Sequence, residues 1–99
     1  MKASLQVDGQ KTPLKPFVES YLANICDAML RSLKGTQDAG QAVFQIEGKK
    51  LELRLDDRPA DLHMDKGFAA VIVRDTLLGV LAHLRGVRGW TEIRVQFDR

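Results

Sequence analysis

The sequence predicts an α+β domain of the ferredoxin-like type, in which two helices cover one face of a four-stranded antiparallel sheet. Four segments alternate apolar and polar residues with the period of a strand, and two have the period of an amphipathic helix. They follow one another in the order strand, helix, strand, strand, helix, strand. Right-handed crossovers in both halves would give the strand order 4-1-3-2. The 99 residues fit one domain, 1–99, with a single core.

The first strand and the first helix are read from residues 3–34. The segment "ASLQV" at 3–7 places Ala3, Leu5 and Val7 on one face, and "DGQ" at 8–10 then turns the chain. Pro16 suits the first turn of a helix, where its missing N–H costs nothing. We therefore expect a helix from residue 16 to about residue 34, with an apolar stripe of Val18, Leu22, Ile25, Met29 and Leu33.

The stretch "AVFQIEGKKLELRL" at 42–55 predicts a β-hairpin with Gly48 and Lys49 as its two-residue turn. This register pairs Ile46 with Leu51, Phe44 with Leu53, Ala42 with Leu55 and Glu47 with Lys50. Residues 56–67 form a polar connection, and a second helix is expected from about 66 to 85. The segment "WTEIRVQF" closes the chain as a strand with Ile93, Val95 and Phe97 inward.

The chain also contains an internal repeat. Residues 17–35 align without a gap with residues 68–86, and both stretches end alike, in "LRSLKG" and "LAHLRG". The apolar stripe recurs in the second copy, which predicts two βαβ halves. A gene duplication would explain the repeat, and so would independent selection by the same fold.

Composition argues against several classes of function. Fifteen Lys and Arg against 13 Asp and Glu give a net charge of +2, too slight to predict a nucleic-acid partner. The expected open sheet face carries no aromatic residue on which RNA bases could stack. No segment approaches the roughly 20 apolar residues of a membrane span. The single cysteine, Cys26, lies in an apolar helical pattern and indicates a reducing compartment, so we expect a soluble cytoplasmic protein.

No catalytic motif emerges, so an enzyme is not the favoured interpretation, and no cofactor is expected. The chain has no phosphate-binding glycine loop and no C-x-x-C pair. The connection does gather Asp56, Asp57, Asp61, His63 and Asp65, but at no recognised metal-ligand spacing. We favour turn chemistry and a helix cap at Asp61 or Asp65, and keep a metal site or an enzyme that uses these residues as minor hypotheses.

The second helix differs from the first by an additional apolar stripe. Val71, Leu78 and Ala82 replace Ser20, Asp27 and Arg31 of the first copy, and Asp75 lies among them. A helix that is apolar nearly all round is usually covered. Either residues 8–15 or 56–64 of the same chain cover the stripe, or a protein partner does. The simplest partner is a second copy in a homodimer, with Asp75 near the two-fold axis or paired with Arg74 of the other subunit.

Two function classes follow. The first is a non-catalytic module that self-associates or binds a protein partner through Val71, Asp75, Leu78 and Ala82. The alternative is a ferredoxin-like regulatory domain that senses a small ligand or an anion near the N-terminal ends of the helices, at Lys15, Arg58, His63 or Lys66.

Overall fold

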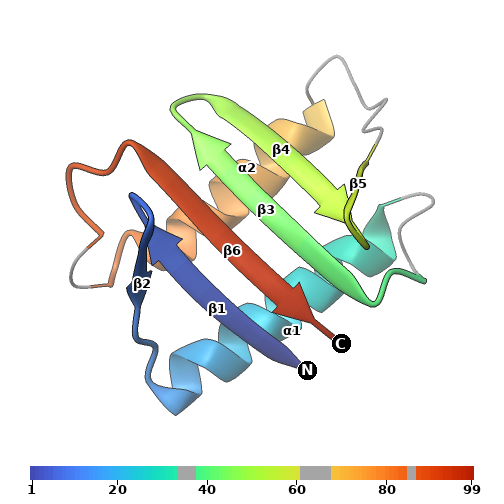
Figure 1. Ribbon diagram of the computed structural model, residues 1–99, viewed down its shortest axis with the longest axis horizontal. Coiled ribbons are helices and arrows are strands. Elements are labelled where there is room, and N and C mark those ends of the chain that lie inside the picture. The colour runs from blue at the N-terminus through green and yellow to red at the C-terminus, as the bar shows by residue number, and fades with distance from the viewer. Residues whose placement is uncertain (34–37, 61–67, 85–86) are drawn as a thin grey trace.

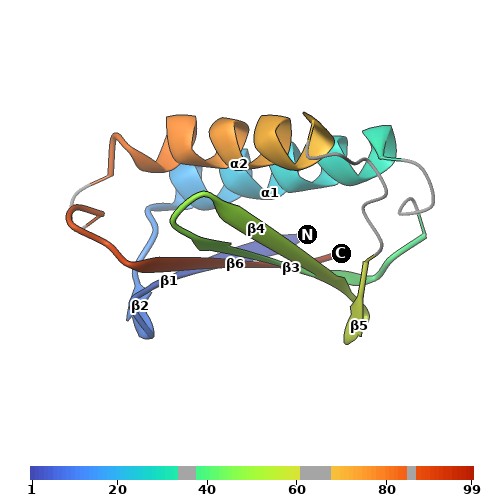
Figure 2. The ribbon, with the colours of Figure 1, turned by 90° about the horizontal axis from the view of Figure 1, so that it is seen from above.

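The computed structural model describes residues 1–33, 38–60, 68–84 and 87–99. Two helices lie side by side on one face of a single antiparallel sheet (Figures 1 and 2). In chain order the elements are β1 (Lys2–Val7), β2 (Gln10–Thr12), α1 (Pro16–Ser32), β3 (Gln41–Glu47), β4 (Lys50–Leu55), β5 (Arg58–Pro59), α2 (Phe68–Leu81) and β6 (Glu92–Asp98). The sheet has six strands in the order β2-β1-β6-β3-β4-β5.

The predicted hairpin is confirmed residue for residue. β3 pairs with β4 in the register that the alternation required, with Ile46 opposite Leu51 and Glu47 opposite Lys50. Gly48 occupies the first turn position with φ +57°, a conformation that costs glycine little. The inward placement of Ile93, Val95 and Phe97 on β6 is also confirmed, because all three are fully buried.

The ferredoxin-like prediction was wrong. The sheet is six-stranded rather than four-stranded, and its four long strands follow the order β1-β6-β3-β4 instead of 4-1-3-2. The difference lies in the hairpin, because β4 pairs on the outer side of β3 and leaves the place between β1 and β3 to β6. Alternation fixes which face of a strand is buried but not which strand lies beside it, so both orders satisfy the same pattern.

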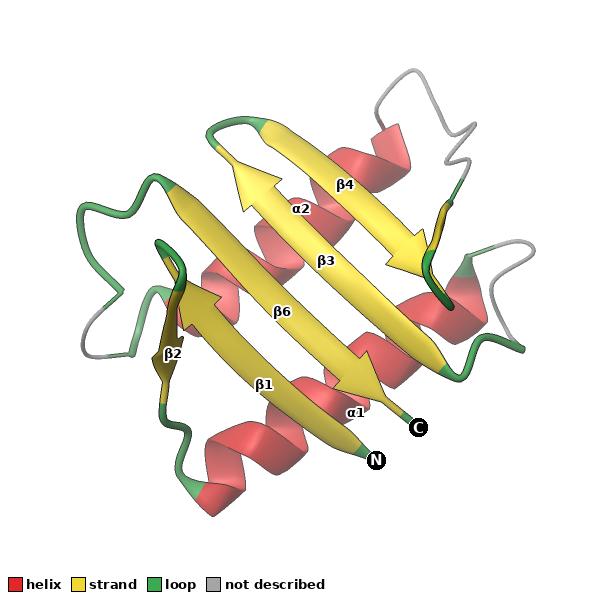
Figure 3. Ribbon diagram, in the orientation of Figure 1, coloured by secondary structure: helices red, strands yellow, loops and turns green. Residues whose placement is uncertain are grey.

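Two short strands, β2 and β5, were missed as well (Figure 3). Each folds back along the preceding long strand, through a turn at Asp8 and Gly9 or at Asp56 and Asp57. All four turn residues have positive φ, between +48° and +81°, as in the tight turns of two-residue hairpins. Strands of three and two residues are too short to show alternation, so the sequence predicts only a turn and a polar connection here.

The core lies between the sheet and the helices. Its largest fully buried side chains are Phe44 and Phe97 at the centre of the sheet, covered by Leu22, Cys26 and Leu30 of α1 and by Leu77 and Leu81 of α2. The inward face of every long strand supplies part of this core, as the period-2 pattern predicted.

The sheet has an internal pseudo-symmetry: exchanging β1 with β4, β2 with β5 and β3 with β6 gives the same strand order read from the opposite edge. The halves β1-β2-α1-β3 and β4-β5-α2-β6 contain corresponding elements, and each half contributes one inner strand, β3 or β6, to a place beside the other half. The two halves are therefore interlocked rather than placed side by side. Gene duplication remains a prediction.

Candidate protein-binding surface

The two helices run antiparallel and leave an apolar groove between them. The end of α1 lies beside the start of α2, where a cavity of about 340 Å³ opens to solvent. The cavity is lined by residues at the C-terminal end of α1 and by residues of the first turns of α2: Ala28, Met29, Ser32, Leu33, Ala69, Ile72 and Val73. Ser32 is the only hydroxyl among them, and it donates to the carbonyl oxygen of Ala28 at 2.8 Å. The groove therefore offers a partner almost exclusively apolar contact.

Large apolar side chains are exposed on this helical layer. In the described part of the chain the exposed ones are Met1 and four helix residues, Phe17 (76% exposed), Tyr21 (49%), Val71 (53%) and Ile72 (49%). The rings of Phe17 and Tyr21 stack with their centroids 5.8 Å apart. We call these four residues and the groove the helical-layer surface. An accumulation of exposed large apolar side chains is typical of interaction sites.

The helical-layer surface is also poor in charge. Among the exposed residues of the two helices that the structure describes, the only charged ones are Arg31 and Asp75. The opposite face of the sheet carries Lys50, Glu52 and Arg54 on β4 alone. Depletion of charge is characteristic of the centre of protein interfaces.

The stripe expected on the second helix is only partly exposed. Val71, Asp75 and Ala82 are exposed, but Leu78 is half-buried and packs against the core. Asp75 forms an ion pair with Arg74 of its own chain, at 3.1 Å. The guanidinium of that arginine also donates to the carbonyl oxygen of Gly48 at 2.7 and 3.0 Å, which ties α2 to the hairpin of β3 and β4. Arg74 is thus engaged within its own chain.

Residues 8–15 and 56–64 were the segments of the chain expected to cover the apolar stripe of the second helix. Their described parts leave much of this stripe exposed. Residues 8–15 lie beside β1 and lead into α1, and Thr12, Pro13 and Leu14 help to line a cavity near the end of α2. Residues 56–60 form the turn and strand β5 at the other edge of the sheet, while residues 61–64 lie outside the described part.

Sequence reasoning did not single out Phe17, Tyr21 and Ile72 as surface residues. A helical projection of the sequence indicates the exposure of Tyr21 and Ile72. Tyr21 lies about 100° around α1 from buried Leu22, and Ile72 lies equally far from buried Val73.

The residues suggested for ligand binding are not brought together. Lys15 lines a cavity of about 330 Å³ with Val18, His83 and Leu84, whereas Arg58 is exposed on β5, at the other edge of the sheet. His63 and Lys66 lie outside the described residues. A single shared site for Lys15 and Arg58 is therefore excluded by the topology.

Part of the acidic connection, Asp56 and Asp57, forms a tight turn, as the sequence predicted. Asp56 accepts hydrogen bonds from the backbone N–H groups of Gly40 and Gln41, and Asp61, His63 and Asp65 lie outside the described residues. Within the residues that are described, no three His, Cys, Asp or Glu side chains gather as a metal site would require. Burial raises the pKa of the Cys26 thiol to about 12, so this cysteine is an inert core residue.

Comparison with known proteins identifies no relative. The chain matches no known protein family, no curated protein and no solved structure. Neither of the two helices, over the residues described, has the length and apolar character needed to span a membrane.

Proposed function

We propose that this protein is a non-catalytic interaction module that binds a second copy of itself through the helical-layer surface. The observation that carries the proposal is the exposure of Phe17, Tyr21, Val71 and Ile72 on the helical layer, together with the apolar groove that Ile72 helps to line. Burying such side chains stabilises a complex by roughly 1.5–3 kcal/mol each when burial is complete. A surface of exposed apolar side chains favours binding to another protein surface over catalysis.

Self-association is favoured by the distribution of charge on this surface. The exposed charged residues of the helices, Arg31 and Asp75, have opposite signs, so pairing the surface with itself brings together no excess of one charge. Ala28 and Gly79 are exposed on the helices, and a Cβ added at Gly79 would meet nothing within 4 Å. Small residues there allow close approach of a second helical layer, and a two-fold axis makes the same patch complementary to itself.

Sedimentation velocity of the full chain tests the proposal. We expect the wild type to sediment as a dimer of the 11.1 kDa chain. Ile72→Asp places a charge in the groove and should weaken the dimer about 30-fold or more, the effect of losing a residue that is central to an interface. A wild type that stays monomeric at several hundred micromolar contradicts self-association.

The matched control is Gln6→Asp, which adds the same charge at an exposed position on the sheet face away from the helices. It should leave the dimer unchanged. Equal dissociation by both substitutions would mean that added negative charge, rather than the helical-layer surface, controls association.

The ligand-sensing alternative is favoured by one observation, the cavity that Lys15 and His83 share. If this cavity binds an anion, inorganic phosphate should raise the midpoint of thermal unfolding, and Lys15→Gln should abolish the increase. The same increase in the variant would exclude this cavity as the site.

A further inference from the structure

The outer edge of β1 is only half occupied. β1 spans Lys2–Val7, but β2 pairs only with its second half, at Leu5, Gln6 and Val7 (Figure 1). In the part of the chain that the structure describes, no strand lies outside Lys2, Ala3 and Ser4. β2 stops at Thr12 because Pro13 follows and has no N–H with which to extend the ladder. The sheet therefore has a gap three residues long, or about 10 Å.

The backbone of Ala3 faces this gap. Residues along an antiparallel strand direct their N–H and C=O groups alternately to the neighbour on either side. The N–H of Asp8 donates to the carbonyl oxygen of Glu92 at 2.9 Å, toward β6, so the odd-numbered residues of β1 point outward. Leu5 and Val7 face β2, and Ala3 is left with one donor and one acceptor toward the gap.

A cavity of about 420 Å³ lies at the gap. Its walls are the first half of β1, residues 11–14, Glu19 of α1 and Asp98 of β6. A volume of this size is within the range of sites that bind small ligands or short peptide segments. The gap therefore combines unpaired backbone groups with a cavity beside them.

The charges around the gap differ between the two sides of the sheet. Lys2, Ser4 and Lys11 share the open side, and both lysines are exposed with no ion pair among the described residues. Asp98 also lies on that side but already accepts a hydrogen bond from Nε2 of Gln41 at 3.0 Å. On the helix side the gap is bordered by Leu14 and Glu19. A residue added opposite Ser4 would lie near both lysines, which favours an acidic side chain there and an apolar one on the helix side.

We propose that this edge of β1 binds an extended segment of a partner protein in which acidic and apolar residues alternate, and that the segment joins the sheet beside Ala3. The backbone of Ala3 would supply the hydrogen bonds of strand addition, and the two lysines would select the acidic residues. This site lies on a different surface from the helical layer, so neither proposal depends on the other.

The test uses the full chain and an acetylated, amidated hexapeptide of alternating valine and glutamate. Amide hydrogen exchange should slow about 10-fold or more at Ala3 when the peptide is bound, while Leu5, already paired with Thr12, is unchanged. The double variant Lys2→Gln with Lys11→Gln should bind the peptide about 5-fold more weakly, as expected for exposed ion pairs. Lys49→Gln, at an exposed lysine in the turn between β3 and β4, is the matched control and should bind normally.

Three outcomes would overturn the proposal. An alternating valine and lysine hexapeptide that binds equally well removes the charge argument. Binding that leaves exchange at Ala3 unchanged excludes strand addition at this edge. Protection of Ala3 in the free protein that disappears on dilution would mean that a second copy, and not a partner peptide, occupies the gap.

Discussion

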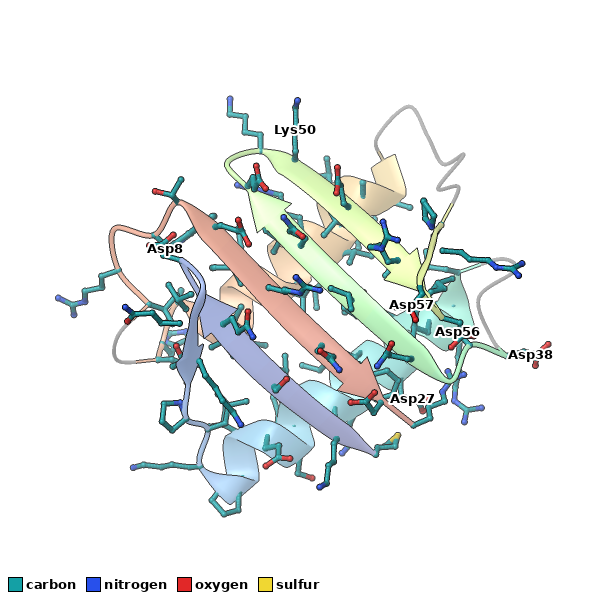
Figure 4. The ribbon with its side chains drawn as sticks, viewed as in Figure 1. Asp8, Asp27, Asp38, Lys50, Asp56 and Asp57 are labelled. Carbon is teal, nitrogen blue, oxygen red and sulfur yellow. The ribbon has the colours of Figure 1, made fainter. Side chains whose placement is uncertain are left out.

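Asp8 and Asp56 make equivalent hydrogen bonds at opposite corners of the sheet (Figure 4). Each follows a long strand, has a positive φ near +50°, and uses its carboxylate to accept the backbone N–H groups of two residues at the start of an inner strand. These are Thr91 and Glu92 for Asp8, both at 2.8 Å, and Gly40 and Gln41 for Asp56, at 3.2 and 3.0 Å. Each carboxylate thereby fastens one half of the chain to the inner strand beside it.

Removing either carboxylate should destabilise the fold. We expect Asp8→Ala and Asp56→Ala each to lower the free energy of unfolding by about 1–3 kcal/mol. Two backbone N–H groups lose their acceptor, and alanine adopts the left-handed backbone conformation less readily than aspartate. Urea denaturation measures the loss. The effects should add in the double variant, since the sites are far apart. Asp38→Ala should change little, because Asp38 is exposed and forms no hydrogen bond among the described residues.

Substitutions at the second residues of the two turns should have opposite effects on stability. Asp57 has φ +66° where the other turn has Gly9 at φ +81°. Asp57→Gly should therefore raise the free energy of unfolding by about 0.5 kcal/mol, and Gly9→Ala should lower it by about 1 kcal/mol. A Cβ at position 9 would meet nothing within 4 Å, so the second effect measures backbone strain alone. Thermal and urea unfolding that changed in the opposite sense would contradict the turn geometry.

Two aspartate substitutions on α2 should behave differently. Leu78 packs against the core, so Leu78→Asp should lower the free energy of unfolding by about 2–4 kcal/mol, because a charge replaces a packed leucine. Val71 is 53% exposed, and Val71→Asp should cost less than about 1 kcal/mol in the monomer. Urea denaturation at low protein concentration separates these effects from association. Equal losses would show that both residues are equally buried.

Asp27 should contribute to the pH dependence of stability. Hydrogen bonding to Arg31 and then to Arg99 holds the pKa of this carboxyl below its ordinary value. The unfolded chain therefore binds the proton more readily than the folded chain, and the stabilisation is complete above the ordinary aspartate pKa of about 4 and decreases as the pH falls below it. The stability difference between the wild type and Asp27→Asn should shrink between pH 6 and pH 3 in urea titrations. A constant difference would exclude this carboxylate as a source of acid sensitivity.

The candidate surface could be predicted in part. The second apolar stripe drew attention to α2, and its residues Val71 and Ala82 are exposed. Leu78 could not be told apart from them, because it packs against the core, and helical spacing alone does not show how α2 is oriented over the sheet. Phe17 and Tyr21 were overlooked since a broad apolar stripe does not reveal where the sheet stops covering the helix.

The sequence by itself determined the long elements, the inward face of each long strand and the register of the central hairpin. Local rules suffice there, because alternation selects a face and a two-residue turn at Gly48 selects the pairing. Only the tertiary structure decided the strand order, because whether β4 lies inside or outside β3 changes no residue's buried face. It also decided that Asp8 binds Thr91 and Glu92, more than 80 positions away, since such contacts depend on which strands become neighbours.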